Sequence, residues 1–206
     1  MLSVVAMASS AAFAETTAQM MDKGRALWEQ KDYRAAAEIF DSIIKADPSC
    51  EEGYYGRAMA HSDLGNFDSA IRDFSVVIRL SPRRAKAYRN RAEAYFSKGE
   101  IDKAIADASE AIRLDPKDGL AFAGRSRMWM EKGKVEDAIR DASRAIDLDP
   151  NEYWAYVNRS GAYLAKRDFE QVIRDATRAI KINPRGWQAY GHRGQAYSAL
   201  ETFHLG

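Results

Sequence analysis

Apolar residues recur along this chain at the spacing of amphipathic helices. In residues 119–133, aromatic and small side chains return every three or four positions, which places them on one face of a helix. A second apolar stripe occupies residues 135–146. Gly133 separates the stripes and Pro150 follows the second, and these residues favour a turn and a helix end. The pattern therefore predicts a hairpin of two helices. The stripes consist of Phe122, Arg125, Ser126 and Trp129, and of Val135, Ala138, Ile139, Ala142, Ala145 and Ile146.

The same pattern returns every 34 residues, the spacing of all five prolines. An isoleucine stands four residues before each proline, and an alanine or valine stands twelve before. A glycine stands seventeen before in three of the repeats, and Lys31 and Arg167 replace it in the outer two. Each unit can bury its apolar face only by stacking on the next, which is the arrangement of a helical repeat protein. The prolines are Pro48, Pro82, Pro116, Pro150 and Pro184.

This combination of period, aromatic and small residues, turn glycine and terminal proline resembles the tetratricopeptide repeat family. The repeated phrase AIRLDP is similar to repeat proteins common in bacterial genomes. The resemblance implies an all-α fold, a right-handed α-solenoid of stacked 34-residue helical hairpins, as a single domain over residues 17–206. The expected repeats are 17–50, 51–84, 85–118, 119–152 and 153–186, with an incomplete sixth repeat at 187–206.

An arginine column departs from the family pattern, which commonly has leucine at this point of the first helix. An aspartate follows most of these arginines by sixteen residues, and the first repeat, with Lys23 and Ile39, lacks both. Because the two residue types appear and vanish together, we expect structural pairs, within a hairpin or between adjacent hairpins, rather than a phosphate-binding ladder. A guanidinium binds a carboxylate through two hydrogen bonds. The predicted pairs are Arg57 with Asp73, Arg91 with Asp107, Arg125 with Asp141 and Arg159 with Asp175; Arg193 continues the arginine column.

The resemblance also implies a binding surface, because the first helices of this family line a concave groove that holds an extended or helical peptide. Methionine adapts to irregular partners, and aromatics beside arginine are typical of interface hot spots. For several of these residues, Trp28 and Leu164 above all, the alternative is that they only cover neighbouring helices. The implied groove residues are Arg25, Tyr55, Met59, Lys86, Arg89, Asn90, Glu93, Phe96, Arg127, Met130, Trp154 and Asn158, with Met21, Trp28, Glu52, Val157 and Leu164 beside them.

Composition argues against several functional classes. Lys and Arg total 31 against 30 Asp and Glu, and these charges are spread along the chain, so we expect no nucleic-acid partner. A phosphate loop, a nucleophile elbow and a spaced set of metal ligands are all missing from the sequence. We therefore expect no catalytic residues, no metal and no cofactor. His61 replaces an aromatic residue of the repeat, so we expect it in the core.

The first fourteen residues contain an apolar run that ends in Ala12, Phe13 and Ala14, an A-x-A cleavage pattern. Residues 1–14 are therefore interpreted as a signal peptide, too short to span a bilayer. Cleavage would leave an exported protein without a membrane anchor, periplasmic or secreted. The stretch lacks the usual basic residue near its start, and if it is not a true signal the protein is cytoplasmic.

These observations predict a non-enzymatic scaffold that binds a peptide or partner protein, with the bacterial cell envelope as its expected place. Two alternatives stay open: an accessory repeat domain of a longer protein or enzyme, and, less favoured, an RNA-binding helical-repeat protein. The sixth repeat stops before its second helix, which leaves an apolar face for self-association.

Overall fold

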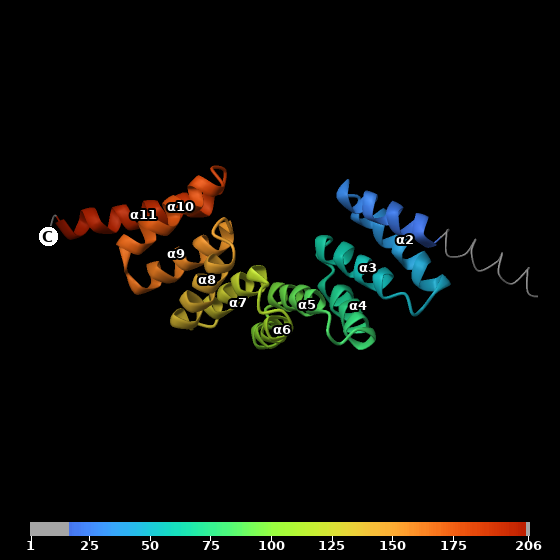
Figure 1. Ribbon diagram of the computed structural model, residues 1–206. Coiled ribbons are helices and arrows are strands. Elements are labelled where there is room, and N and C mark those ends of the chain that lie inside the picture. Colours follow the sequence, from blue (N-terminus) through green and yellow to red (C-terminus); the bar gives the residue numbers. More distant parts are fainter. Residues whose placement is uncertain (1–16, 205–206) are drawn as a thin grey trace, which may run out of the picture. The chain divides into compact units, whose positions relative to one another are not determined.

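The computed structural model describes residues 17–204, and every regular element in that range is a helix (Figure 1). The predicted signal peptide at residues 1–14 lies outside the described residues. The chain divides into two compact units between Lys98 and Gly99. Among the described residues, no helix is long and apolar enough to cross a membrane.

The first unit contains a helix over residues 17–29, followed by α2 (Tyr33–Ala46), α3 (Glu51–Asp63), α4 (Phe67–Leu80) and α5 (Ala85–Ser97). Helices that are neighbours in sequence pack on one another, α2 on α3, α3 on α4 and α4 on α5. The core side chains Phe40, Ile43, Phe74 and Val77 are at most 2% exposed, so α2 and α4 supply the large residues that α3 covers.

The second unit contains α6 (Ile101–Leu114), α7 (Gly119–Glu131), α8 (Val135–Leu148), α9 (Tyr153–Lys166), α10 (Phe169–Ile182) and α11 (Trp187–His204). Each helix packs on the next, and α9 also contacts α7 and α11, the two other first helices. The predicted all-α fold of stacked helical hairpins is confirmed for the described residues.

Alanine columns bring the helices together. Ala70, Ala104 and Ala138 occupy equivalent places in three second helices and are completely buried. A side chain of one carbon lets two helix backbones approach closely, and alanine also favours the helix itself. These alanines are therefore contact surfaces of the hairpins.

The loop inside each hairpin contains one residue in the left-handed region. Gly65, Gly99 and Gly133 have φ of 73–77°, and the two non-glycine substitutes at the same place, Lys31 and Arg167, have φ of 64° and 61°. All five repeats therefore use the same turn, although only three have the residue that adopts it without strain.

We expect Lys31→Gly to raise the free energy of unfolding by about 0.5–1 kcal/mol. A non-glycine residue in the left-handed region costs roughly 1–2 kcal/mol, and the variant removes this strain. Glycine also has more conformational freedom in the unfolded chain, and this entropy offsets part of the gain in stability. Urea denaturation measures the change. Lys31→Ala is the control, because it keeps the Cβ and removes only the exposed amine, and we expect no gain from it. Equal gains from both variants would contradict the interpretation.

Candidate functional site

A pocket of 340 Å³ lies in the first unit between the helix at residues 17–29 and α3. The first helix contributes Met21, Arg25 and Trp28, and α3 contributes Glu52, Tyr55 and Met59. All six are among the groove residues that the family resemblance implies. The pocket combines sulfur and aromatic side chains with an exposed arginine and an exposed glutamate, so it offers both apolar contact and charge.

Phe40 also lines this pocket and lies close to two glycines, Gly24 and Gly56, and the groove prediction did not include these three residues. Phe40 and Gly56 both line the pocket, and the Phe40 ring is 2% exposed. A Cβ placed on Gly24 would lie 2.8 Å from this ring, and one on Gly56 would lie 2.5 Å from it. The ring therefore sits between two helix backbones at places where no side chain fits. Glycine inside a helix is unfavourable, and that is the signal in the sequence that points to a close contact.

Tyr55 is held in one orientation by several neighbours. Its ring packs edge-on against Phe74 at 5.8 Å, and the Arg84 guanidinium lies 4.1 Å from its centre on the ring face. Its hydroxyl accepts a hydrogen bond of 2.8 Å from the Asn90 amide. Burial raises the pKa of the Tyr55 phenol, so the group stays neutral at physiological pH. Tyr55 thus presents a fixed, neutral aromatic surface to the pocket.

The predicted groove residues of α5 differ in their surroundings. Lys86 is exposed, whereas Arg89, Glu93 and Phe96 are half-buried. Asn90 also donates to the Met59 sulfur at 3.1 Å, so both printed bonds of its amide lead to α3. Asn90 therefore joins two first helices, a structural role that the groove interpretation had not assigned to it.

In the second unit, the predicted groove residues lie on α7 and α9. Arg127 is exposed and Met130 is half-buried. Trp154 is 49% exposed and packs edge-on against Tyr153 at 5.0 Å. Asn158 donates to the Ala123 carbonyl at 2.9 Å, so it joins α9 to α7 as Asn90 joins α5 to α3. Trp154 is the large apolar side chain of this set that stays open to a partner.

The predicted arginine–aspartate pairs form within single hairpins. Arg57, Arg125 and Arg159 each donate two hydrogen bonds of 2.7–2.9 Å to the aspartate sixteen residues later. These aspartates, Asp73, Asp141 and Asp175, are 2–6% exposed. The bond with Asp73 raises the pKa of the Arg57 guanidinium, which keeps its charge. A buried carboxylate is thus matched by a two-point partner, as an interior ion pair requires.

Each of these arginines also reaches the preceding repeat. Nη1 of Arg125 donates to Ser109 at 2.9 Å and Nη1 of Arg159 to Ser143 at 3.0 Å. Arg91 makes the equivalent bond to Ser75, at 2.9 Å. The bridge therefore runs both within and between hairpins, where the sequence left the two open. The serine column, spaced by 34 residues, was the missed signal.

Two predicted partners, Arg91 and Asp107, lie in different units. Asp107 is 9% exposed. The Arg91 guanidinium lies 5.7 Å from the centre of the Tyr88 ring, a distance similar to those between the other arginines of this column and the aromatic rings three residues earlier. Their pairing stays a prediction.

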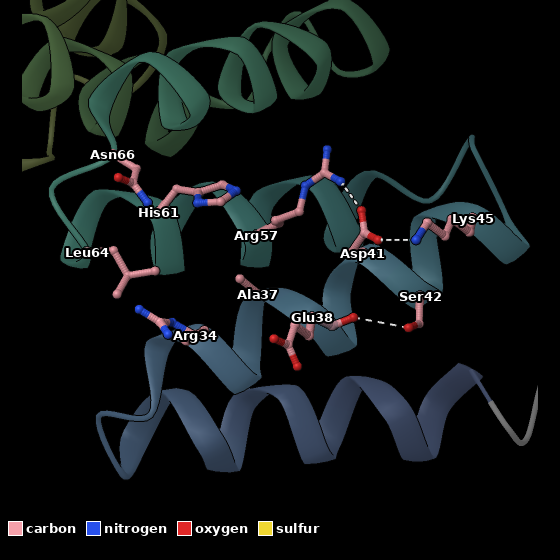
Figure 2. A pocket seen from close by; sticks show the side chains of 10 residues that line it. All are labelled: Arg34, Ala37, Glu38, Asp41, Ser42, Lys45, Arg57, His61, Leu64 and Asn66. Carbon is pink, nitrogen blue, oxygen red and sulfur yellow. Dashed lines mark hydrogen bonds and ion pairs between the residues drawn. The ribbon is translucent and has the colours of Figure 1, made fainter.

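At the first junction, the repeat pattern changes. At the next three junctions a lysine at the end of a first helix binds an acid at the start of the preceding second helix: Lys98 with Asp68, Lys132 with Asp102 and Lys166 with Glu136, at 2.5–3.3 Å. Leu64 and Arg34 occupy these two places at the first junction and cannot pair. A pocket of 620 Å³, lined by both, opens there between α2 and α3 (Figure 2).

The same pocket contains two further departures from the repeat. Asp41 stands at the position that is serine in the next repeats, such as Ser75. It binds Nη1 of Arg57 at 2.6 Å and Nζ of Lys45 at 2.7 Å (Figure 2). His61, expected in the core, is only half-buried and lines the pocket, and its Nδ1 is buried without a hydrogen-bond partner. Burial lowers the pKa of His61. In the same column, Trp129 donates to Asp141 at 3.1 Å, a bond that His61 does not reproduce.

A serine–histidine contact joins α9 to α11. Ser160 Oγ lies 2.7 Å from His192 Nδ1, and it donates its proton to the Val157 carbonyl at 2.8 Å. Since a hydroxyl has one proton, it accepts from Nδ1–H of His192. Ser160 is completely buried, so the pair serves packing between repeats and not nucleophilic attack. Among the described residues, no group of three or more His, Cys, Asp or Glu side chains is placed to hold a metal ion.

We expect stability to fall as the pH drops from 7.5 towards 5.5, and to fall less in His192→Asn. Burial lowers the pKa of His192, so below its ordinary value of about 6.5 the unfolded chain takes up a proton that the folded chain resists. The stability contributed by neutral His192 is therefore complete above that pH and is lost below it. Asparagine suits the variant because Asn90 and Asn158 occupy the same column. Urea denaturation at each pH measures the effect, and parallel pH profiles would contradict it.

A tetratricopeptide repeat family model matches residues 21–74, 55–119 and 99–153. Together the matches span residues 21–153, more than half of the 206-residue chain. The chain belongs to the tetratricopeptide repeat family. Tetratricopeptide repeats are generally interaction modules without catalysis, which agrees with a site made of apolar contacts and structural ion pairs.

One known protein matches a short part of this tetratricopeptide repeat protein in sequence, and several solved structures share its fold. A "Protein SGT1 homolog" from Oryza sativa subsp. japonica is 39% identical over 51 residues, which are 25% of this chain and only 14% of that protein's length. The structure of TTC0263, a thermophilic tetratricopeptide repeat protein of Thermus thermophilus, is 19% identical and covers 88% of this chain and 98% of its own, with a TM-score of 0.72.

YrrB, described as a tetratricopeptide repeat protein with an unusual peptide-binding site, is 17% identical. The alignment covers 89% of this chain and 98% of YrrB, with a TM-score of 0.68. At these identities, the solved structures show a shared fold, and the side chains of the groove have to be argued from this chain alone.

Proposed function

We propose that this protein is a non-enzymatic scaffold that holds a peptide segment of a partner protein against its first helices. The observation that supports this most is the pocket of the first unit, where six side chains expected at the groove come together around the buried Phe40 ring. A concave, mostly apolar site with a few charged groups is the usual form of a binding pocket.

The chemistry of the pocket favours a peptide with an apolar side chain next to charged ones. Trp28, Tyr55 and Met59 offer aromatic and sulfur surface. The Arg25 and Glu52 side chains are 61% and 57% exposed. Each already pairs with a neighbour, Asp22 and Arg84, at 2.8 Å, so a charged group of the peptide would share or exchange these partners. Trp28 is itself oriented by a hydrogen bond of 2.7 Å from its Nε1 to Asp63. A rigid aromatic in a pocket is a common anchor for binding.

The proposal includes a location, the bacterial cell envelope, reached by export. Its support is the A-x-A pattern at the end of the apolar stretch in residues 1–14. Expression of the full chain fused to alkaline phosphatase, which is active only after export, tests this part. A matched fusion that lacks residues 1–14 is the control, and equal phosphatase activity of the two fusions would contradict export.

We expect Trp28→Ala to weaken peptide binding at least tenfold. The probe is a set of peptides selected by phage display against the mature chain, and the dissociation constant of each is measured by fluorescence anisotropy. Loss of an aromatic anchor costs about 2 kcal/mol or more of binding free energy, whereas loss of a peripheral contact costs little. A second variant, Arg89→Glu with Phe96→Ala, tests whether the site continues onto α5.

Leu80→Ala is the matched control for these variants. Leu80 is an apolar side chain, 43% exposed, that ends α4 and lines none of the pockets described above. Circular dichroism shows whether each variant keeps its helices. If no peptide is enriched, or if Trp28→Ala and Leu80→Ala bind the selected peptides as the unchanged protein does, the proposed function is wrong.

A further inference from the structure

The pocket of 620 Å³ between α2 and α3 contains two charged side chains without a partner (Figure 2). Arg34 and Glu38 both line it, and both are exposed. Within residues 17–201, whose side chains are described, neither side chain makes an ion pair or a hydrogen bond. The other charges of the pocket are paired, because Asp41 binds both Lys45 and Arg57. The pocket therefore offers one cation and one anion to a ligand.

The first repeat reverses a charge order that most of the other second helices share. In place of Arg34 and Glu38, α4 has Asp68 and Arg72. The same order, an acid and then an arginine four residues later, occurs as Glu136 with Arg140 and as Glu170 with Arg174. Acid before base is the order that stabilises a helix more at this spacing. The charges of α2 thus contribute less to their own helix, which leaves them for an outside partner.

One end of the pocket gathers hydrogen-bond donors that suit a carboxylate. Figure 2 shows Arg34, Leu64 and Asn66 at this end, and Asp41 and Lys45 at the other. Asn66 is the N-cap residue of α4, yet its side chain makes no capping hydrogen bond, as asparagine usually does there. Its amide can donate to a carboxylate that Arg34 binds at two points. Leu64, 38% exposed, adds apolar surface beside them.

The shape of the pocket favours an extended peptide. Small-molecule sites bury about 70–90% of their ligand, whereas Arg34, Glu38, Leu64 and Asn66 are all exposed along the rim. A helix with its side chains is about 10–12 Å wide, too wide to enter between two packed helices. Arg34 and Glu38 are four residues apart, about 6 Å along α2. In an extended peptide, side chains two positions apart lie on one side at a similar spacing, about 6.8 Å.

We propose that the pocket between α2 and α3 binds an extended segment of a partner protein in which an acidic and a basic residue stand two positions apart. The acidic side chain pairs with Arg34 and accepts from Asn66, and the basic side chain pairs with Glu38. An apolar residue two positions to the other side of the acid lies over Leu64. The site uses none of the groove residues, so it goes beyond the proposed function and adds a second binding site of different chemistry.

The probe is the peptide Ser-Leu-Ser-Asp-Ser-Lys-Ser with both ends blocked, titrated into the full chain and followed by NMR at the Arg34 guanidinium and the Leu64 methyl groups. We expect saturable shifts at both. Asparagine in place of the peptide aspartate, or Arg34→Ala in the protein, is expected to weaken binding about fivefold, the upper range for an exposed ion pair. Arg174→Ala, an exposed arginine of α10 outside the pocket, is the matched control and leaves the affinity unchanged.

Two further variants separate pairing from general damage. Arg34→Glu protein is expected to prefer a peptide with lysine in place of the aspartate, which a misfolded protein could not do. Leu64→Lys with Arg34→Asp installs the lysine–acid bridge of the next three junctions. This variant is expected to lose the binding without any fall in the free energy of unfolding, measured by urea denaturation.

Several outcomes would overturn the proposal. These are the absence of saturable shifts at several millimolar peptide, and binding that is the same in Arg34→Ala. Acetate that binds as tightly as the peptide would make a small acid the ligand. A dimer in sedimentation analysis that Arg34→Ala dissociates would make a second copy the occupant.

The groove variant Trp28→Ala is expected to leave this binding unchanged, and Arg34→Ala is expected to leave the binding of the groove peptides unchanged. The two sites can therefore fail separately. If Trp28→Ala weakens binding of the probe as much as Arg34→Ala does, the probe occupies the groove and the second site is wrong.

Discussion

Arg159→Ala is expected to lower the free energy of unfolding by about 3 kcal/mol, because it leaves a buried charge without its partner. Asp175 is 5% exposed and receives two hydrogen bonds from Arg159 at 2.7 and 2.8 Å. Without the guanidinium, this carboxylate must stay charged in an apolar interface, take up a proton or drag water into the hairpin, and each of these destabilises the folded state. Urea denaturation followed by circular dichroism measures the loss.

A double-mutant cycle decides whether the pair acts as a unit. We expect Asp175→Ala to cost less than Arg159→Ala, because the arginine side chain is 21% exposed and can reach water. The double variant is expected to lose much less than the sum of the two, since it leaves neither charge buried. Arg193→Ala is the matched control from the same column, and its loss is expected to be small because no buried aspartate depends on it. Additive losses would show that the pairing has no structural role.

The second large effect is expected at Gly56, where alanine should destabilise the protein by about 2 kcal/mol. Inside a helix, replacing glycine by alanine usually stabilises by up to about 1 kcal/mol. At Gly56 the new Cβ would lie 2.5 Å from the Phe40 ring, and Gly24 is so close to the same ring that a Cβ there would lie 2.8 Å from it. Overpacking of about 1–3 kcal/mol therefore exceeds the helix gain.

Gly191→Ala is the control for this reversal of sign. Gly191 lies inside α11, and a Cβ built on it meets nothing within 4 Å. We expect this variant to be stabilised by up to about 1 kcal/mol, so the two substitutions should change stability in opposite directions. Thermal and urea denaturation of both variants measure this. A gain at Gly56 would mean that the Phe40 ring is free to move and that the base of the pocket is not rigid.

Side-chain pairs that recur with the repeat could be predicted from the sequence. Arg57 and Asp73 were matched because an arginine and an aspartate appear together and vanish together, and two-point pairing is the simplest physical reason for that. The third contact, from Arg57 to Asp41 and from Arg125 to Ser109, was missed. Serine is common and weakly informative, and this column is recognisable only when the second helix of one repeat is known to face the first helix of the next.

The candidate site could be predicted only in outline. The family resemblance implied that Tyr55 and Met59 face the groove, and both line the pocket of the first unit. It could not reveal that Asn90 uses its amide to join α5 to α3, because a hydrogen bond between first helices depends on their separation and rotation. His61 was expected in the core from its column, yet it lines the open pocket between α2 and α3, together with Leu64 and Arg34.

The sequence by itself determined the helical hairpins, their 34-residue period, the glycine turns of the three middle repeats and the pairs of Arg57, Arg125 and Arg159 with their aspartates. These features are local or periodic. Each therefore recurs in several repeats of the sequence, and the repeated occurrences support the same interpretation. Tertiary structure alone decided the close contact of Phe40 with Gly24 and Gly56 and the open pocket at the first junction. Such features occur once and depend on distances between helices. The spacing of residues along the chain does not reveal these distances.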